Sequence, residues 1–180
     1  RSSHLFMPMP DVIREDMAFL DRIHFYIPGW ELPKMKVEFF TNHYGFVVDY
    51  LAEALRELRK YTFTEVLDRH FLLGSHLKSR DVKAVRKTVS GLVKLIYPNG
   101  ELSKDEVAEL TELALEGRRR VKEQLKKMGS FEFHQTSFSL IDNETRDEKF
   151  VGVPEQGGRD MISLDPLAPG SVYTSSVDDQ

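Results

Sequence analysis

The sequence has 180 residues, of which 41% are hydrophobic and 30% are charged, with a formal net charge of −4. This composition is typical of a soluble globular protein and excludes a disordered chain, and no apolar run is long enough for a transmembrane helix. Cysteine is absent, which excludes disulfides, thiolate metal sites and cysteine nucleophiles, and favours a cytoplasmic location. Because the sequence starts at Arg1 and stops without a closing element, we expect an excerpt of a longer protein.

The first half of the chain predicts three helices and one short strand. Residues 10–22 predict a short helix that begins at Pro10, and residues 24–29 predict a strand followed by a turn. Residues 36–60 carry apolar side chains at steps of three and four, which predicts an amphipathic helix. Gly45 weakens the middle of this helix by about 1 kcal/mol relative to alanine. Residues 64–71 predict another short helix, which Gly74 closes.

Two longer helices follow, each with a start and a stop signal. Ser79 is the predicted N-cap of a helix from Arg80 to about Ile96, which ends before Pro98. The run from Ser103 to Glu106 is a capping box, and the helix that it opens keeps one apolar stripe as far as Gly129.

After Gly129 the pattern changes from helix to strand. Alternating apolar residues over 131–140 and a short apolar run over 150–153 predict a β-hairpin, and residues 172–177 predict one more strand. We therefore place a boundary near residues 129–130. The predicted fold class is mainly α with a β-containing C-terminal part, an α+β protein.

Several common kinds of site are not expected. The six histidines are scattered and lack the spacing of metal ligands, so no metal site is predicted. The sequence has no G-x-S-x-G motif of a hydrolase and neither of the usual glycine-rich loops that bind phosphate.

Two arginines have positions that suggest phosphate binding. Arg22 lies where a predicted helix ends and a strand begins, and a guanidinium at such an edge can reach across a subunit boundary to a phosphate. The alternative for Arg22 is a salt bridge with Asp16 or Asp21. Arg80 directly follows the predicted N-cap, where the helix dipole disfavours cations unless an anion binds there. Its alternative is a solvated side chain.

A basic cluster occupies residues 118–127, where six cations and Glu123 sum to +5. The C-terminal end of a helix favours cations, so ordinary helix electrostatics is one interpretation. The other is a contact with nucleic acid or a neighbouring subunit, for which we single out Arg119, Arg120 and Lys127. Arg118 flanks the apolar stripe, so we expect it to run along the lid or the domain-interface surface and to stabilise the fold.

Six phrases of the sequence together resemble one family. They are MAFLDRIH (17–24), YIPGWELPK (26–34), SRDVKAV (79–85), SGL (90–92), RRRVKEQ (118–124) and VGVPEQGG (151–158). From about His4 to the C-terminus the chain resembles the Lon-like AAA+ ATPases of BREX bacteriophage-defence systems, the BrxL family.

The resemblance implies a domain organisation and two site residues. Residues 1–34 would end the large AAA+ subdomain, residues 35–129 would be an AAA+ lid-type helical bundle, and residues 130–180 would start the Lon-like C-terminal domain. Arg22 resembles an arginine finger that acts in trans, and Arg80 resembles the sensor-2 arginine that contacts ATP.

The resemblance also implies partners and cofactors of the parent protein. It would be a homo-oligomeric ring on DNA, with ATP and magnesium bound between subunits. The phosphate-binding loop is expected upstream of Arg1, so we expect no tight ATP binding by this chain alone. The serine–lysine dyad of Lon proteases has no counterpart here, so proteolysis is unsupported. The alternative hypothesis is a non-enzymatic helical adaptor that binds protein or nucleic acid through residues 118–127.

Overall fold

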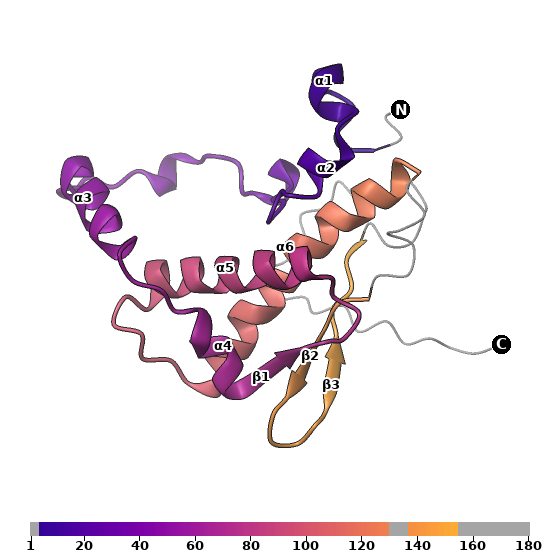
Figure 1. The fold of residues 1–180 in the computed structure, drawn as a ribbon. Helices are drawn as coiled ribbons and strands as arrows, with labels where there is room; N and C mark the ends of the chain where they lie inside the picture. The colour runs from indigo at the N-terminus through magenta and orange to yellow at the C-terminus, as the bar shows by residue number, and fades with distance from the viewer. Residues whose placement is uncertain (1–3, 130–136, 155–180) are drawn as a thin grey trace.

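The computed structural model of the chain describes residues 4–129 and 137–154, and Figure 1 shows its fold. Two long helices, α5 (Ser79–Ile96) and α6 (Lys104–Lys127), form its centre. The shorter helices are α1 (Asp11–Arg14), α2 (Met17–Leu20), α3 (Val48–Leu58) and α4 (Thr64–His70), with 3-10 turns at Gly29–Glu31 and Val37–Phe39. The strands are β1 (Phe71–Leu73), β2 (Ser139–Asp142) and β3 (Glu148–Phe150). The predicted class, mainly α with a smaller β-containing part, is confirmed.

The main hydrophobic core lies where α4, α5 and α6 meet the sheet. Its fully buried members are aliphatic side chains from the helices together with one phenylalanine that precedes β2: Leu67, Val85, Val89, Val93, Val107, Ala114, Leu115 and Phe138. Burial of each large apolar side chain contributes about 1.5–3 kcal/mol. A second core of Phe6, Leu20, Val121 and Leu125 holds the N-terminal segment against the second half of α6.

Both long helices begin with a side-chain cap. The predicted capping box of α6 is confirmed, since the Ser103 backbone N–H donates to Glu106 Oε2 at 2.7 Å and the Glu106 N–H donates to Ser103 Oγ at 3.3 Å. In α5 the predicted cap is displaced by one residue, because Ser79 is already helical and Lys78 precedes the helix. The Lys78 backbone N–H donates to Asp81 Oδ2 at 3.2 Å. Arg80 is therefore the second residue of α5. It lies beside Asp81, whose carboxylate accepts a backbone N–H at the start of the helix and interacts favourably with the helix dipole.

The sheet has the order β1-β2-β3, and both pairs of strands are antiparallel. Strands β2 and β3 confirm the hairpin, although the predicted start at residues 131–136 and the predicted strand at 172–177 lie outside the described residues. Strand β1 was not predicted, because local pattern gave no reason to pair Leu72 with Ile141. Gly74 ends this strand, where a Cβ would lie 2.0 Å from Ser139 Oγ.

The N-terminal predictions were partly wrong. The expected helix over 10–22 is broken into α1 and α2, because Asp16 leaves the helical conformation and its side chain accepts a hydrogen bond from the Phe19 N–H at 2.9 Å. Residues 24–28 of the expected strand pair with no strand among the described residues, and Gly29 begins a 3-10 turn. The Tyr26 N–H donates instead to the Gly117 carbonyl of α6 at 3.1 Å.

The expected helix over 36–60 is also shorter than predicted. Only α3, Val48–Leu58, is α-helical, and the earlier part of the segment contains just the 3-10 turn at Val37–Phe39. None of the residues of α3 is buried, and Figure 1 shows α3 set apart from the central helices. The helix starts only after Gly45, because a glycine costs about 1 kcal/mol in a helix relative to alanine and no residue of this segment is buried to offset that cost. No helix within the described residues has the length and apolar character needed to cross a membrane.

Candidate functional site: two arginines joined by a buried ion cluster

Arg22 follows α2 and its side chain is exposed. Its guanidinium donates to the Ala18 carbonyl one turn earlier. Within residues 4–129 and 137–154 it forms no ion pair, so the salt bridge with Asp16 or Asp21 considered above is not found there. Among the described residues, its charged group is thus held at the surface by one backbone contact.

Arg80 is half-exposed, with 52% of its side chain accessible, and is directed toward the Arg22 segment. Its Nη1 lies 2.8 Å from Oδ2 of Asp21, the residue immediately before Arg22. Because Asp21 is buried, Arg80 reaches inward to this carboxylate while part of its side chain remains accessible. Two arginines that are 58 positions apart in the sequence are therefore linked through one aspartate.

The same aspartate belongs to a buried ion cluster, which we define as Asp21, Asp81, Arg118 and Lys122. Arg118 donates to Asp81 Oδ1 and to Asp21 Oδ1, each at 2.8 Å. Lys122 lies 2.5 Å from Asp21 Oδ1 and 3.2 Å from Asp81 Oδ1. All four residues are at least 95% buried. The cluster joins the end of α2 to α5 and α6, and its two acids balance its two bases.

Charge pairing outweighs burial for the Asp21 carboxyl. Burial on its own raises the pKa of Asp21, but hydrogen bonds from Lys122 and Arg80 and the nearby Arg118 charge hold this pKa below its ordinary value of 3.8. Asp21 is therefore ionised at neutral pH. Buried ion pairs of this kind are costly to break from one side, because the remaining charge is left without compensation.

The lowered pKa of Asp21 predicts acid sensitivity. A carboxyl with a folded-state pKa below its unfolded value stabilises the fold above about pH 4, and that stabilisation is lost as the pH falls through the folded-state pKa. Asp21→Asn should therefore be much less stable than wild type at pH 6–7, and the difference should shrink below about pH 4. Urea unfolding of the 180-residue chain at each pH, followed by circular dichroism, measures it.

The matched control is Asp147→Asn, since Asp147 is exposed in the hairpin loop. Its stability should stay within about 0.5 kcal/mol of wild type throughout. If the difference in unfolding free energy between Asp21→Asn and wild type is the same from pH 3 to 7, Asp21 is not ionised and paired in the folded protein.

The backbone after Arg22 is clamped to α6. Arg118 donates to the Ile23 carbonyl, and the Tyr26 N–H donates to the Gly117 carbonyl. A Cβ on Gly117 would lie 2.2 Å from the Phe25 ring, so glycine at this position lets the ring lie directly on the helix. The segment that carries Arg22 is thus fixed along α6 by side-chain, backbone and ring contacts.

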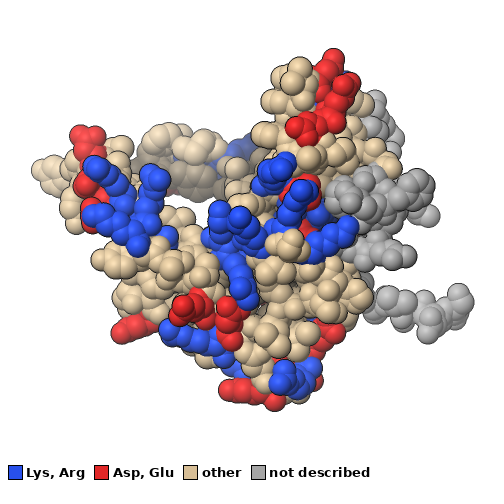
Figure 2. All heavy atoms as spheres, viewed as in Figure 1, with Lys and Arg blue, Asp and Glu red and all other residues tan. Residues whose placement is uncertain are grey.

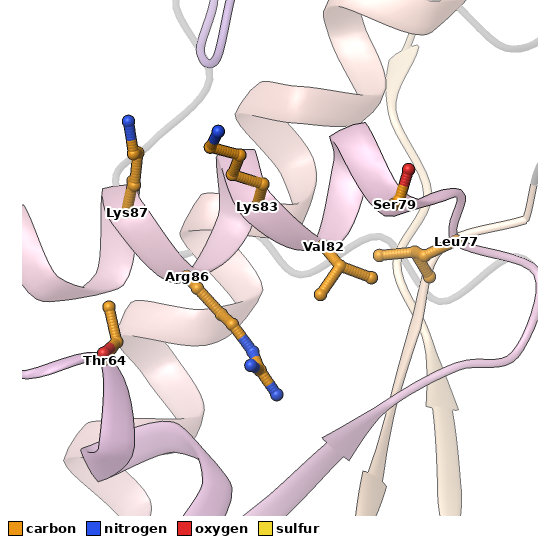
Figure 3. A pocket seen from close by; sticks show the side chains of 7 residues that line it. All are labelled: Thr64, Leu77, Ser79, Val82, Lys83, Arg86 and Lys87. Atoms are coloured by element: carbon orange, nitrogen blue, oxygen red, sulfur yellow. The ribbon is translucent and has the colours of Figure 1, made fainter.

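Exposed lysines extend the positive charge of Arg80 along α5. Lys83 and Lys87 follow Arg80 by three and seven residues, and Figure 3 shows both projecting from the same side of the helix. Figure 2 shows basic side chains gathered over the face where α5 runs. Burial first and then the charges of Lys87, Arg118 and Lys83 lower the pKa of His24, which places this histidine against the same face.

A groove lies beside this basic face. It is lined by residues of α4, α5 and the turn before α5: Thr64, Leu77, Ser79, Val82, Lys83, Arg86 and Lys87. Arg86 projects from the opposite side of α5 to the two lysines and pairs with Asp68 of α4 at 2.7 Å (Figure 3). In the part of the chain that the structure describes, no three acidic or histidine side chains are arranged to hold a metal ion.

The three consecutive arginines of α6 have three different environments, as their 100° spacing around the helix requires. Arg118 belongs to the buried ion cluster. Arg119 donates to the Val151 carbonyl at 2.7 Å and lies over the Phe138 ring, which ties α6 to the hairpin. Arg120 pairs with Glu31 at 2.9 Å and with Glu116 at 2.7 Å. Arg118 was expected along the lid or the domain-interface surface; its side chain is instead fully buried, where the segment that carries Asp21 meets α5 and α6.

The predicted contact residues differ in accessibility. Arg119 and Arg120 are 6% and 4% exposed, so an outside partner would reach them only after these intrachain contacts open. Lys127 is half-buried, and its amine forms no hydrogen bond or ion pair with any described residue. Their role toward nucleic acid or a neighbouring subunit stays a prediction.

Sequence reasoning missed the connection between the two arginines. Arg118 and Lys122 are one helical turn apart, which is a signal for a shared face, but Asp21 lies 97 and 101 positions from them. Lys83 and Lys87 could have been found, because their spacing from Arg80 places them on one side of a helix.

Comparison with known proteins identifies the family. Residues 1–139 match the family described as "Lon-like protease BrxL-like, ATPase domain". The chain belongs to this BrxL-like family. The match confirms the resemblance drawn from the sequence, and it extends beyond the boundary predicted near residues 129–130, so that β1 and the start of β2 lie within it.

Two relatives in this family are similar to nearly the whole chain. A protein of Bacillus cereus (strain H3081.97) named Lon-like protease BrxL is 59% identical over 174 residues, which cover 97% of this chain and 26% of that protein. A protein of the same name from Escherichia coli O9:H4 (strain HS) is 55% identical over 173 residues, covering 96% of this chain and 25% of that protein. The chain thus spans about a quarter of the length of the curated relatives it matches.

Proposed function

We propose that the chain is the arginine-finger and lid region of a BREX-type Lon-like AAA+ ATPase, which acts in bacteriophage defence as a cytoplasmic ring on DNA. The observation that carries this proposal is the link between Arg22 and Arg80 through Asp21. A finger and a sensor must each be held in place and still offer a guanidinium to phosphate. Membership of the BrxL-like ATPase domain supports the same function.

The two arginines fit the phosphates of a nucleoside triphosphate. Arg80 lies in the first turn of an 18-residue helix, where the backbone N–H groups and the dipole favour an anion. Arg22 offers an accessible guanidinium, whose planar fork suits two phosphate oxygens. We propose that Arg80 binds ATP of its own subunit and that Arg22 binds ATP of the neighbouring subunit. When bound with magnesium, ATP supplies the phosphoryl group that is transferred to water.

The test is ATP hydrolysis by the full-length protein with Arg80→Ala. A charged hydrogen bond to phosphate contributes about 1.5–3 kcal/mol, so kcat/KM should fall by about 10- to 100-fold. The matched control is Arg59→Ala, since Arg59 is also an exposed arginine and its side chain has no bonded partner among the described residues. Absence of ATP hydrolysis by wild type, or equal kcat/KM for the two variants, would contradict the proposal.

DNA remains the proposed macromolecular partner. Of the three contact residues that the sequence suggests, Lys127 is the most accessible, and Arg119 and Arg120 are buried among intrachain contacts. The alternative of a non-enzymatic adaptor binding through residues 118–127 is less well supported, because most of that surface is used inside the chain.

A further inference from the structure

We propose that Asp21 is a positioning residue that couples Arg80 to Arg22, so that phosphate binding at Arg80 changes the orientation of Arg22. This inference rests on the proposed function. It adds a route by which nucleotide binding in one subunit's site would change the orientation of Arg22, the arginine that acts in the neighbouring subunit's site.

The two oxygens of Asp21 have different partners. Oδ1 is held by Arg118 and Lys122 inside the protein, whereas Oδ2 accepts from the partly accessible Arg80. An anion that binds the Arg80 guanidinium competes with Oδ2 but leaves the contacts of Oδ1 in place. Asp21 therefore keeps its buried anchor while its outer contact weakens.

A change at Asp21 is passed directly to Arg22. The two residues share a peptide bond, and the backbone beyond them is clamped to α6 through Ile23 and Tyr26. Because the backbone after Arg22 is fixed in this way, a movement of the Asp21 side chain shifts the backbone between the end of α2 and Arg22. Arg22 is well suited to respond, because its guanidinium is held only by the Ala18 carbonyl among the described residues.

Asp81 provides a matched comparison. It is buried like Asp21, and its Oδ1 also contacts Arg118 and Lys122. Its other oxygen accepts from the Lys78 backbone N–H rather than from Arg80. Removing either charge thus disturbs the same buried cations. Among the contacts of the described residues, the change at Asp21 removes a partner of Arg80 and the change at Asp81 does not.

The experiment is a pair of double-mutant cycles in the full-length protein, with kcat and KM for ATP measured for each variant. The variants are Asp21→Asn, Asp81→Asn, Arg80→Ala and the two double variants that contain Arg80→Ala. We expect Asp21→Asn to lower kcat/KM about tenfold and to have little further effect once Arg80 is absent, since contacting residues couple by about 0.5–3 kcal/mol. By contrast, the fold-losses in kcat/KM caused by Asp81→Asn and by Arg80→Ala should multiply in their double variant.

The outcomes separate this inference from the proposed function. The coupling through Asp21 is overturned if the fold-losses in kcat/KM of Asp21→Asn and Arg80→Ala multiply in the double variant. It is also overturned if Asp81→Asn couples to Arg80→Ala equally strongly. In both cases the proposed ATP hydrolysis stands. If wild type does not hydrolyse ATP, both are overturned. Should Asp21→Asn fail to fold, Asp21→Glu takes its place in the cycle, because it keeps the buried charge and displaces the contact with Arg80. If the double variant Asp21→Glu, Arg80→Ala loses less kcat/KM than the product of the two single losses, the coupling is supported. If its loss equals that product, the coupling is overturned.

Discussion

Replacement of Arg22 by alanine in the full-length protein should lower ATP turnover by roughly 10³- to 10⁵-fold, the effect of removing an arginine finger. The physical reason is the loss of a positive charge that stabilises the transferring phosphoryl group. Arg22 has an accessible guanidinium on a backbone clamped to α6, as such a role requires. The KM for ATP should change far less than kcat, which steady-state kinetics would measure.

Mixing experiments test whether Arg22 acts on a neighbouring subunit. Arg22→Ala subunits keep their own nucleotide loop, and subunits with a disabled phosphate-binding loop keep Arg22. Each variant should be inactive alone, whereas an equal mixture should regain about a quarter of wild-type turnover, because a ring places each subunit against the next in random order. Arg59→Ala should remain fully active in the same assay. A mixture as inactive as its components would contradict action in trans.

Replacement of Arg118 by alanine should destabilise the fold by about 3–5 kcal/mol, because it leaves two buried carboxylates with only part of their compensation. Arg118 is fully buried, contacts both acids of the buried ion cluster and donates to the Ile23 carbonyl. Native-state hydrogen exchange of the α6 amides in the full-length protein would measure the local loss. Since whole domains are stable by about 5–15 kcal/mol, the loss should be large enough to change the midpoint of unfolding.

The control for this prediction is Arg14→Ala. Arg14 pairs with Asp11 on the surface of α1, and exposed pairs of this kind contribute about 0–1 kcal/mol. Equal losses for the two variants would show that burial of Arg118 adds nothing to its energetic role.

The long helices could be predicted from sequence because their signals are local. The capping box of Ser103 and Glu106 lies within four residues, and Tyr97-Pro98 stops α5 without help from elsewhere. The extent of α3 could not be predicted, since its apolar pattern finds no partner in the described residues. Strand β1 depends on pairing with β2, which follows about seventy residues later, and three residues carry too little pattern to show it.

The site was only half predictable for the same reason. Arg80 breaks a local electrostatic rule at a helix start, so it can be singled out from a few neighbouring residues. Its partner Asp21 cannot, because the contact spans 59 positions and depends on how the chain returns along α6. Arg118 was expected at the lid or domain-interface surface because it flanks the apolar stripe of α6, and its full burial follows from its two distant aspartate partners, which helix spacing does not show.

The antiparallel pairing of Phe71 with Asp142 has a consequence for synthesis of the protein on the ribosome. When α4, α5 and α6 have emerged, the edge of β1 still exposes unpaired backbone groups, and the core still lacks Phe138 and Leu140. Unpaired strand edges and exposed apolar surface make nascent chains prone to association. The helices therefore complete their packing only after translation has passed Asp142, and until then the edge of β1 is open to pairing with other chains.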